Sequence, residues 1–353
     1  MVAMSGGVDS SAAAFLMKEK GYDVTGVTMK LYVPPVDGLQ SSCCSVTDME
    51  DAKSVCAKLE IPYEVADYRD DFENSVIKHF ADEYEAGRTP NPCIECNRRL
   101  KFGSLMQRAL SSGYDRVATG HYARIAYDEI TCRYRLLKGI DPSKDQSYVL
   151  YMLGQDELSH LEFPCGEYTK DRIRDIAAEH GFVNASKKDS QDICFIPDGD
   201  YARFLSERRG GEYEPGDFVD SEGNVLGRHK GIINYTVGQR RGLGISSAEP
   251  YYVVDIRPDI NEVVLGRKKE LEKKEVMATD FNWLSIDEPL NGHAVECSAK
   301  IRYSHKGAFG RAKAMGDGRV KMVFDEPVGG VSPGQALVLY DGDMVLGGGI
   351  IAG

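Results

Sequence analysis

Residues 2–24 read VAMSGGVDSSAAAFLMKEKGYDV, in which a short apolar stretch leads into two glycines and then into an alanine-rich run. Two glycines directly after a strand leave several backbone N–H groups able to converge on an anion, and the following helix adds its positive end. The hydroxyls of Ser5, Ser10 and Ser11 supply further donors, and the Asp9 carboxylate can hold a magnesium ion against phosphates. The stretch therefore predicts a phosphate-binding loop, although a plain turn built on two glycines is the simpler alternative.

The segments that follow alternate between strand and helix patterns. Strands are expected at residues 1–5, 23–32, 61–68 and 115–125, helices at 9–20, 45–59 and 71–85, and a hairpin through 133–137. Strands separated by helices of this length predict a doubly wound, parallel α/β sheet. Ligands of such sheets bind at the carboxyl ends of the strands, where the loop at 5–11, Met29 and Gly120 fall.

Length and composition limit the classes of protein. A chain of 353 residues is long enough for two or three domains, and its 42% hydrophobic content is that of a globular protein. The sequence has no apolar run of the roughly 20 residues that a membrane span needs, and no secretory signal. Nine cysteines without such a signal indicate a reducing compartment. We therefore expect a cytoplasmic protein with no membrane association.

The pattern changes after about residue 200. Residues 210–245 are rich in glycine with short β-like runs, and later stretches such as HAVECSAKIRY (293–303) and GQALVLY (334–340) are typical of antiparallel strands. We expect a catalytic α/β domain at residues 1–200, a small central β-rich domain at 201–268 and a C-terminal β-barrel at 269–353.

Three cysteines stand in segments whose composition indicates chemistry. GRTPNPCIECNRRLKFG (87–103) places Cys93 and Cys96 in a C-x-x-C within a proline-bounded loop, and KKDSQDICFIP (187–197) places Cys194 after a charged turn. A lone cysteine such as Cys194 is more often a buried small hydrophobe, whereas two thiols three residues apart in a loop have no packing reason. Weaker candidates are Cys43 and Cys44, and the cysteines interpreted as packing residues are Cys56, Cys132, Cys165 and Cys297.

The charge distribution favours an RNA surface. A net charge of −12 argues against indiscriminate nucleic-acid binding. However, residues 223–248 and 298–316 contain no Asp or Glu, and Arg98, Arg99 and Lys101 flank the C-x-x-C. Each stretch alone would be an ordinary solvated face, but three in an acidic chain favour RNA. The basic residues of the two longer stretches are Arg228, Lys230, Arg240, Arg241, Lys300, Arg302, Lys306, Arg311 and Lys313.

The string SGGVDSS (5–11) lacks the lysine of the G-x-x-x-x-G-K-[ST] loop and the spacing of G-x-G-x-x-G. It resembles the pyrophosphate loop of the N-type ATP pyrophosphatases, which split ATP into AMP and pyrophosphate. Further motifs extend the resemblance from Met4 to Gln335, and the whole chain resembles the tRNA-specific 2-thiouridylases, the MnmA family. These motifs are TPNPCIECN, ATGHYAR, KDQSYVLY, KKDSQDICFI, YTVGQRRGLGI, KIRYSHKG and PGQALVLY.

The resemblance implies a reaction on the wobble uridine of tRNA. ATP adenylates the C2 oxygen, and a sulfur nucleophile then displaces AMP to leave 2-thiouridine. The sulfur would come from an outside donor, either a cysteine-desulfurase relay protein or free sulfide. Within the chain, Cys96 would be the catalytic nucleophile and Cys194 the carrier of a persulfide.

The resemblance also implies binding roles for individual residues. ATP and Mg²⁺ would be bound by Ala3, Met4, Ser5, Gly6, Gly7, Val8, Asp9, Ser10, Met29 and Gly120. The target base would be met by Asn91, Pro92 and Cys93, and His121 would lie against the tRNA. Other tRNA contacts would be Lys144, Asp145, Gln146, Arg302, Tyr303 and Gln335.

Cys93 departs from the family pattern, because most members resembling this chain have aspartate there. The acid of the target-base loop is therefore missing, and its role does not transfer. Cys93, Cys96 and Cys194 could instead hold a [4Fe–4S] cluster with one iron open to bind sulfur. We favour this cluster route because of the additional thiol, and the two-cysteine persulfide route stays open.

Two other classes of function fit parts of the sequence. A small-molecule ligase or amidotransferase of the same superfamily would turn ATP into AMP with a metabolite and without tRNA. A non-catalytic tRNA-binding sulfur carrier would bind tRNA without releasing pyrophosphate. Neither alternative needs both the phosphate loop and the thiols.

Overall fold

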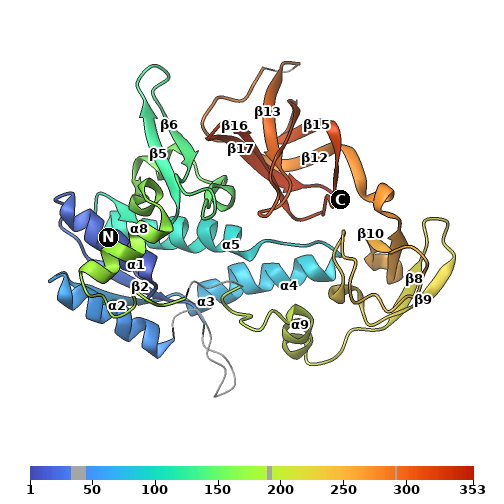
Figure 1. The fold of residues 1–353 in the computed structure, drawn as a ribbon, viewed down its shortest axis with the longest axis horizontal. Coiled ribbons are helices and arrows are strands. Elements are labelled where there is room, and N and C mark those ends of the chain that lie inside the picture. Colours follow the sequence, from blue (N-terminus) through green and yellow to red (C-terminus); the bar gives the residue numbers. More distant parts are fainter. Residues whose placement is uncertain (33–44, 189–192, 291) are drawn as a thin grey trace. The chain divides into compact units, whose positions relative to one another are not determined.

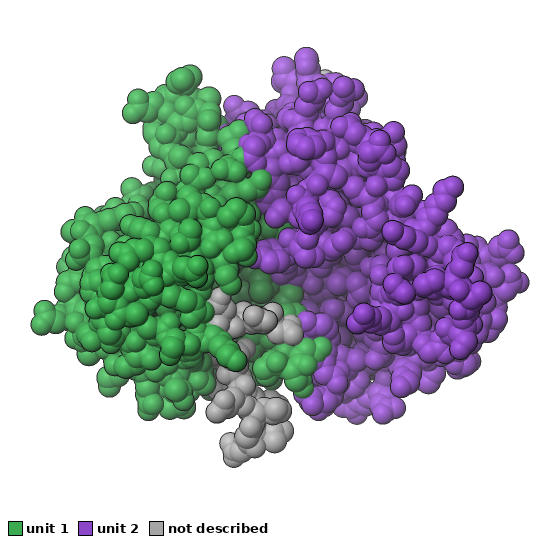
Figure 2. Space-filling model, in the orientation of Figure 1, with its two compact units in different colours: residues 1–77, 92–199, 343–345 green, residues 78–91, 200–342, 346–353 purple. Residues whose placement is uncertain are grey.

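The computed structural model describes residues 1–32, 45–188, 193–290 and 292–353. The chain forms two compact units, coloured separately in Figure 2. Unit 1 comprises residues 1–77, 92–199 and 343–345, and unit 2 comprises residues 78–91, 200–342 and 346–353. Cys43 and Cys44, the weaker candidates for sulfur chemistry, lie outside the described residues.

Unit 1 is built on a five-stranded sheet with the order β3-β2-β1-β4-β7. All of its pairings are parallel, which confirms the predicted α/β class. Its central strand β1 lies between β2 and β4, so the strand order reverses there, and such a reversal opens a crevice at the carboxyl ends. The strands are β1 (Val2–Ala3), β2 (Gly26–Lys30), β3 (Tyr63–Asp67), β4 (Val117–Ala118) and β7 (Leu161–Glu162).

Helices α1 (Val8–Glu19), α2 (Val46–Lys58) and α8 (Lys170–Glu179) pack on this sheet (Figure 1). The alanine run of α1 is fully buried, since small side chains allow the helix to approach the strands closely. The Ser45 hydroxyl caps α2 in a capping box with Asp48, and Thr169 caps α8. No helix within the described part of the chain is long and apolar enough to cross a membrane.

The C-x-x-C lies on helical backbone, so the prediction of a proline-bounded loop is wrong. Helix α5 (Pro92–Glu95) runs directly into the π-helical segment η2 (Cys96–Ser104) and then into α6 (Leu105–Ser111). Pro92 begins α5, because proline is favoured in the first turn of a helix, where its missing N–H has no partner to lose. π-helical turns are rare and are found most often at functional sites.

Two other sequence predictions about unit 1 need correction. The strand expected at 115–125 is interrupted at Thr119–Tyr122, so β4 and β5 (Ala123–Asp128) belong to different sheets. The helix expected at 71–85 begins at Arg69 with α3 (Arg69–Phe72) and includes a π-helical turn, η1 (Glu73–Ile77). Strand β5 forms the predicted hairpin with β6 (Arg133–Lys138).

The remaining short elements of unit 1 follow this hairpin and connect it to α8. They are η3 (Ser147–Leu150), α7 (Gln155–Ser159) and η4 (Pro164–Glu167). Within the same unit, Met344 pairs with Leu137 of β6.

Unit 2 begins with α4 (Lys78–Glu85), and ring contacts connect this helix to α9 (Tyr201–Arg209). A four-stranded sheet with the order β10-β11-β8-β9 follows, as expected for a small central β-rich region. Its core is formed by apolar side chains around Phe218 and Val263. The strands are β8 (Gly216–Val219), β9 (Val225–His229), β10 (Tyr252–Arg257) and β11 (Glu262–Gly266), with the short 3-10 turns η5 (Ile232–Asn234), η6 (Pro258–Ile260) and η7 (Lys268–Leu271).

The C-terminal strands form a closed barrel, which confirms the last part of the predicted fold. Their order is β12-β15-β14-β13-β16-β17, and a β12–β17 pairing closes the ring. Along β14, Gly310, Ala312 and Ala314 are buried and alternate with exposed residues, as a small barrel requires. The strands are β12 (Glu272–Trp283), β13 (Ala294–Lys300), β14 (Ala308–Gly316), β15 (Arg319–Gly329), β16 (Ala336–Asp341) and β17 (Met344–Ile351).

Candidate active site

The loop between β1 and α1 is held in shape by its own hydroxyls. The Ser5 N–H and hydroxyl lie 3.1 and 3.2 Å from the Ser10 Oγ, and the Ser10 hydroxyl donates to the Gly7 carbonyl at 3.0 Å. Gly6 has a φ of +74°, and a Cβ there would lie 2.2 Å from the Asp48 carbonyl oxygen. Glycine is therefore required at position 6 by both the backbone conformation and the space.

The predicted ATP-binding residues gather around this loop. Ala3 and Met4 lead into it, and Gly7 is the N-cap of α1 with no side chain to cap the helix, so backbone N–H groups are left to meet an anion. Met29 is buried near the end of the neighbouring strand β2. Gly120 lies against α1, since a Cβ there would approach the Ser10 nitrogen to 2.9 Å.

Asp9, in the first turn of α1, has two partners that the sequence reasoning missed. The Lys170 Nζ lies 2.6 and 2.8 Å from the two oxygens of its carboxylate, and the Tyr122 hydroxyl donates to Oδ1 at 2.6 Å. Side-chain exposure is 32% for Asp9 and 7% for Lys170. The carboxylate of Asp9 is therefore partly open to solvent, whereas the ammonium that it contacts is buried. Nothing in YTKDR (168–172) distinguishes Lys170 from an ordinary surface lysine.

A second network that the sequence reasoning missed holds the opposite flank of the loop. The Asn184 side-chain amide donates to the Gly6 carbonyl at 3.0 Å and to the Ser11 hydroxyl at 2.9 Å. The Lys187 ammonium contacts Asp48 at 2.6 Å, Asp51 at 2.7 Å and the Gly6 carbonyl at 3.2 Å. Lys187 is the first residue of the KKDSQDICFI motif, so this motif contributes to the phosphate loop as well as carrying Cys194.

The donor set around the loop suits magnesium better than a softer metal. Asp9 offers carboxylate oxygens and Ser5 and Ser10 offer hydroxyls, and Mg²⁺ is usually bound by one or two carboxylates together with substrate phosphates. Lys170 contacts both Asp9 oxygens, however, so a metal ion at Asp9 would have to share or replace that contact.

The two thiols of the C-x-x-C differ in their surroundings. Cys93 is exposed, whereas Cys96 is buried at the first position of η2. Protein atoms close to its sulfur nevertheless raise the pKa of Cys93, and the charge of Lys101 acts in the opposite direction. Between the two thiols, the buried Glu95 pairs with Arg98 at 3.6 Å and with Arg99 at 3.4 Å. This pairing offsets part of the basic charge predicted to flank the thiols.

Cys194 lies half-buried in a segment anchored by the next residue. The ring of Phe195 meets Phe72 at 5.6 Å and Tyr32 at 6.4 Å between centroids, both edge to face. Across the described ranges of the chain, no group of three or more His, Cys, Asp or Glu side chains is arranged to hold a metal ion. The described side chains therefore offer no preformed set of ligands for an iron–sulfur cluster, which stays a prediction, and we derive no step through one.

His121 is buried in unit 1. Its Nδ1 lies 2.6 Å from the Thr119 hydroxyl oxygen, and its ring packs against Phe102 and Phe163. Burial, followed by the charge of Lys101, lowers the pKa of His121 well below its usual range, so the ring is neutral at physiological pH. A contact between His121 and tRNA stays a prediction.

Asp145 and Gln146, two of the predicted tRNA residues, bind the protein's own backbone. The buried Asp145 carboxylate accepts from the Gly139 and Ser147 N–H groups at 3.3 and 3.1 Å. Gln146 exchanges two 2.9 Å hydrogen bonds with the Tyr122 backbone. The Gln146 bonds position Tyr122, the partner of Asp9, so Gln146 supports the phosphate loop indirectly. Lys144 is half-buried beside them.

In unit 2, Gln335 contacts the segment that leads to the predicted target-base loop. Its side-chain amide donates to the Thr89 carbonyl at 2.8 Å, and the Thr89 N–H donates to the Pro333 carbonyl at 2.8 Å. Thr89 lies two residues before Asn91, which is half-buried. Arg302 donates to the Gly329 carbonyl at 3.2 Å, and Tyr303 is 45% exposed.

The predicted basic stretches differ in how strongly their charges are paired. Arg228 contacts Asp217 at 3.2 Å, and Arg311 contacts Glu296 at 3.3 Å, so these two charges are partly neutralised. Arg240 and Arg241 are both exposed. This pair is the clearest exposed basic feature of the central region.

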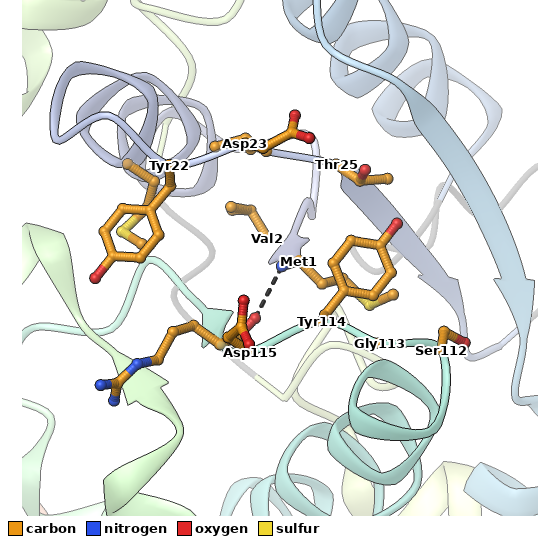
Figure 3. A pocket seen from close by; sticks show the side chains of 12 residues that line it. Met1, Val2, Tyr22, Asp23, Thr25, Ser112, Gly113, Tyr114 and Asp115 are labelled. Atoms are coloured by element: carbon orange, nitrogen blue, oxygen red, sulfur yellow. Dashed lines mark hydrogen bonds between the residues drawn. The ribbon is translucent and has the colours of Figure 1, made fainter.

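A cavity of about 300 Å³ lies at the amino-terminal ends of the strands of unit 1 (Figure 3). Its lining includes Tyr22, Thr25, Tyr114 and Arg116, and none of the predicted site residues contributes to it. Parallel α/β sheets bind their ligands at the opposite, carboxyl ends. We therefore do not assign the ATP site to this cavity.

Comparison with known proteins gives matches along nearly the whole chain. Residues 1–198 match the tRNA methyl transferase HUP domain, residues 202–267 the tRNA methyl transferase PRC-barrel domain, and residues 273–351 the aminomethyltransferase beta-barrel domain. The tRNA-specific 2-thiouridylase MnmA of Acetivibrio thermocellus is 51% identical, covering 99% of this chain and 98% of its own length. The protein of the same name from Carboxydothermus hydrogenoformans is 50% identical, covering 99% and 96%.

Proposed function

The chain belongs to the tRNA-specific 2-thiouridylase family, and on this premise we propose that it is a tRNA-uridine 2-sulfurtransferase that activates the uridine with ATP. The observation that carries the proposal is the braced loop at residues 5–11, at the strand reversal of a parallel sheet and directly before α1. Such a loop is suited to a pyrophosphate group.

The first step is adenylation. The C2 oxygen of the uridine attacks the α-phosphorus of ATP, the bond to the β-phosphate breaks, and pyrophosphate leaves. The backbone N–H groups at the start of α1 would bind the phosphates, the Ser5 and Ser10 hydroxyls hold the loop in shape, and Asp9 would hold the magnesium ion. The ion, when bound, offsets the charge that develops on the leaving pyrophosphate. Lys187 and Asn184 both donate hydrogen bonds to the Gly6 carbonyl and so help to hold the loop in its shape.

The second step is sulfur delivery by the two-cysteine route. Cys194 carries a persulfide whose outer sulfur is transferred from a persulfide on a relay protein, which leaves as its thiolate. Free sulfide is already hydrosulfide, so it would bypass both cysteines and attack the adenylated C2 directly. The Cys96 thiolate attacks the inner sulfur of Cys194, so the outer sulfur leaves as hydrosulfide and the two cysteines form a disulfide. The hydrosulfide attacks the adenylated C2, the C–O bond breaks, and AMP leaves. A thiol reductant then returns both cysteines to thiols.

The tRNA contacts are proposed from exposure and position. Arg240 and Arg241 are exposed and would bind phosphates, and Tyr303 is exposed beside Arg302. Gln335 and Thr89 would position the segment that contains Asn91 at the target base. We place the reaction in the cytoplasm, in keeping with the reducing conditions that the thiols require.

Pyrophosphate release with tRNA and sulfide supplied separately tests the function. We expect release to depend on tRNA and to occur once per site without sulfide, and thiolated uridine to form only when sulfide is added. Release without tRNA but with a metabolite would instead indicate a small-molecule ligase. Binding of tRNA with no pyrophosphate release under any condition would indicate a sulfur carrier.

A further inference from the structure

Lys170 occupies a position that is unfavourable for a lysine. It is the first residue of α8, where the helix dipole disfavours a positive charge, and it is 6% exposed. Lysine is almost never this buried unless its ammonium is paired. Its own helix therefore gives no reason for the charge, and the explanation must lie in what the ammonium contacts.

The ammonium contacts the one carboxylate of the phosphate loop. Both Asp9 oxygens lie within 2.8 Å of the Lys170 Nζ, and the Tyr122 hydroxyl supports the same carboxylate from a second direction. The Lys170 N–H is bound by Asp141 at 3.0 Å, which fixes the backbone from which the side chain extends. The contact between Lys170 and Asp9 is thus held by elements more than 160 residues apart in sequence.

The two partners differ in their access to solvent. Only 7% of the Lys170 side chain is exposed, compared with 32% of the Asp9 side chain. A cation that arrives from solvent therefore approaches the contact from the Asp9 side. A carboxylate in contact with an ammonium binds a second cation less well, because like charges at close range repel each other. Lys170 therefore lowers the affinity of Asp9 for a metal ion as long as the contact is kept.

We propose that Lys170 is a placeholder cation for Asp9: it neutralises the carboxylate when no nucleotide is bound and releases it when metal–ATP arrives. The released ammonium then lies beside the phosphates, where its charge remains favourable. Lys170 is on this account a positioning residue that prevents the empty loop from binding divalent ions. The inference deepens the proposed function and rests on its assignment of the ATP site to this loop.

The test is a titration of nucleotide-free protein with Mn²⁺, with the unbound ion followed by electron paramagnetic resonance. Wild-type protein should bind Mn²⁺ weakly, whereas Lys170→Met should bind one ion at least about tenfold more tightly, because the competing charge is gone. Lys170→Arg keeps a cation at the site and should stay weak. The double variant Asp9→Asn/Lys170→Met should lose the added affinity.

Either of two results would overturn the proposal. One is a Lys170→Met protein that binds Mn²⁺ no more tightly than wild type, and the other is added affinity that persists in the double variant. If Lys170→Met fails to fold, as judged by circular dichroism, Lys170→Gln replaces it in the same titration. The titration contains no nucleotide, so a failure of the proposed ATP chemistry, seen as absent pyrophosphate release, would leave its result unchanged.

Discussion

The phosphate loop and the thiol segments of unit 1 are built in different ways. The loop at residues 5–11 is braced by its own hydroxyls and held from both flanks, by Lys170 through Asp9 and by Lys187 through Gly6. Cys96 and Cys194 lie instead on separate elements, at the start of η2 and beside Phe195. The described side chains include no metal-binding group that would hold these thiols together.

This difference suggests how the two steps of the proposed reaction divide. A loop that is already braced can bind phosphates with little reorganisation, whereas the thiols proposed for sulfur transfer belong to other elements than the loop. Activation and sulfur transfer should then be separable by mutation. The four variants below examine that comparison in order of decreasing expected effect.

Asp9→Asn should have the largest effect, since it removes the carboxylate assigned to the magnesium ion. We expect pyrophosphate release to fall by at least about a hundredfold, with thiolation falling in parallel, because several kcal/mol of charge stabilisation would be lost. The measurement is pyrophosphate release at saturating tRNA. Asp9→Asn leaves the buried Lys170 ammonium without its carboxylate, so Asp9→Asn/Lys170→Met serves as a folding control. Release at the wild-type rate would show that the ATP site lies elsewhere.

Gly6→Ala should destabilise the folded protein as well as the site. A left-handed φ costs a non-glycine residue about 1–2 kcal/mol, and the Cβ would also clash with the Asp48 carbonyl oxygen at 2.2 Å. Gly113→Ala is the matched control, because Gly113 has a φ of +83° with no atom within 4 Å of its Cβ position. Chemical denaturation should show a larger loss of unfolding free energy for Gly6→Ala than for Gly113→Ala. Equal losses would mean that the loop adjusts to the added methyl group.

Replacing Arg240 and Arg241 together by Gln should have an intermediate effect confined to tRNA. Loss of two phosphate contacts should weaken binding of all tRNA species similarly and reduce the slope of log affinity against log salt by about 1 for each contact. Filter binding across a salt series measures both quantities. Lys53→Gln, which removes an exposed charge from α2, is the control. An unchanged slope in the double variant would exclude this region from the tRNA surface.

Cys93→Asp should have the smallest effect. In the two-cysteine route Cys93 carries no sulfur, and aspartate restores the residue that most members of the family have there. We expect thiolation close to that of wild type from protein that contains no iron. If Cys93→Asp instead lost thiolation, iron and absorbance near 400 nm together relative to wild type, the cluster route would be established, because [4Fe–4S] clusters absorb roughly there.

The sequence predicted the parts of the site whose contacts are local. The phosphate loop follows from SGGVDSS alone, because its hydrogen bonds join residues at most five positions apart. The barrel likewise follows from the alternation in its strands. By contrast, Lys170, Asn184 and Lys187 reach the loop from more than 130 residues away, and no local pattern indicates which lysine will be buried.

The errors in secondary structure have a related cause. The stretch at residues 115–125 was predicted as one strand, but Gly120 has to lie against α1, and the chain changes sheets there. Prolines around the C-x-x-C suggested a loop, yet Pro92 begins a helix, a position where proline is also favoured. In both cases tertiary contacts decided between two local interpretations that the sequence permits.

The most direct test of the account is a single-turnover measurement on Cys194→Ser protein with tRNA and ATP. Phosphate loop and thiols should act separately, so we predict one pyrophosphate released per active site at the wild-type rate, with no thiolated uridine when the tRNA is digested and analysed by mass spectrometry. Loss of the pyrophosphate burst in folded Cys194→Ser protein would contradict the account. Activation and sulfur delivery would then depend on a single assembled site.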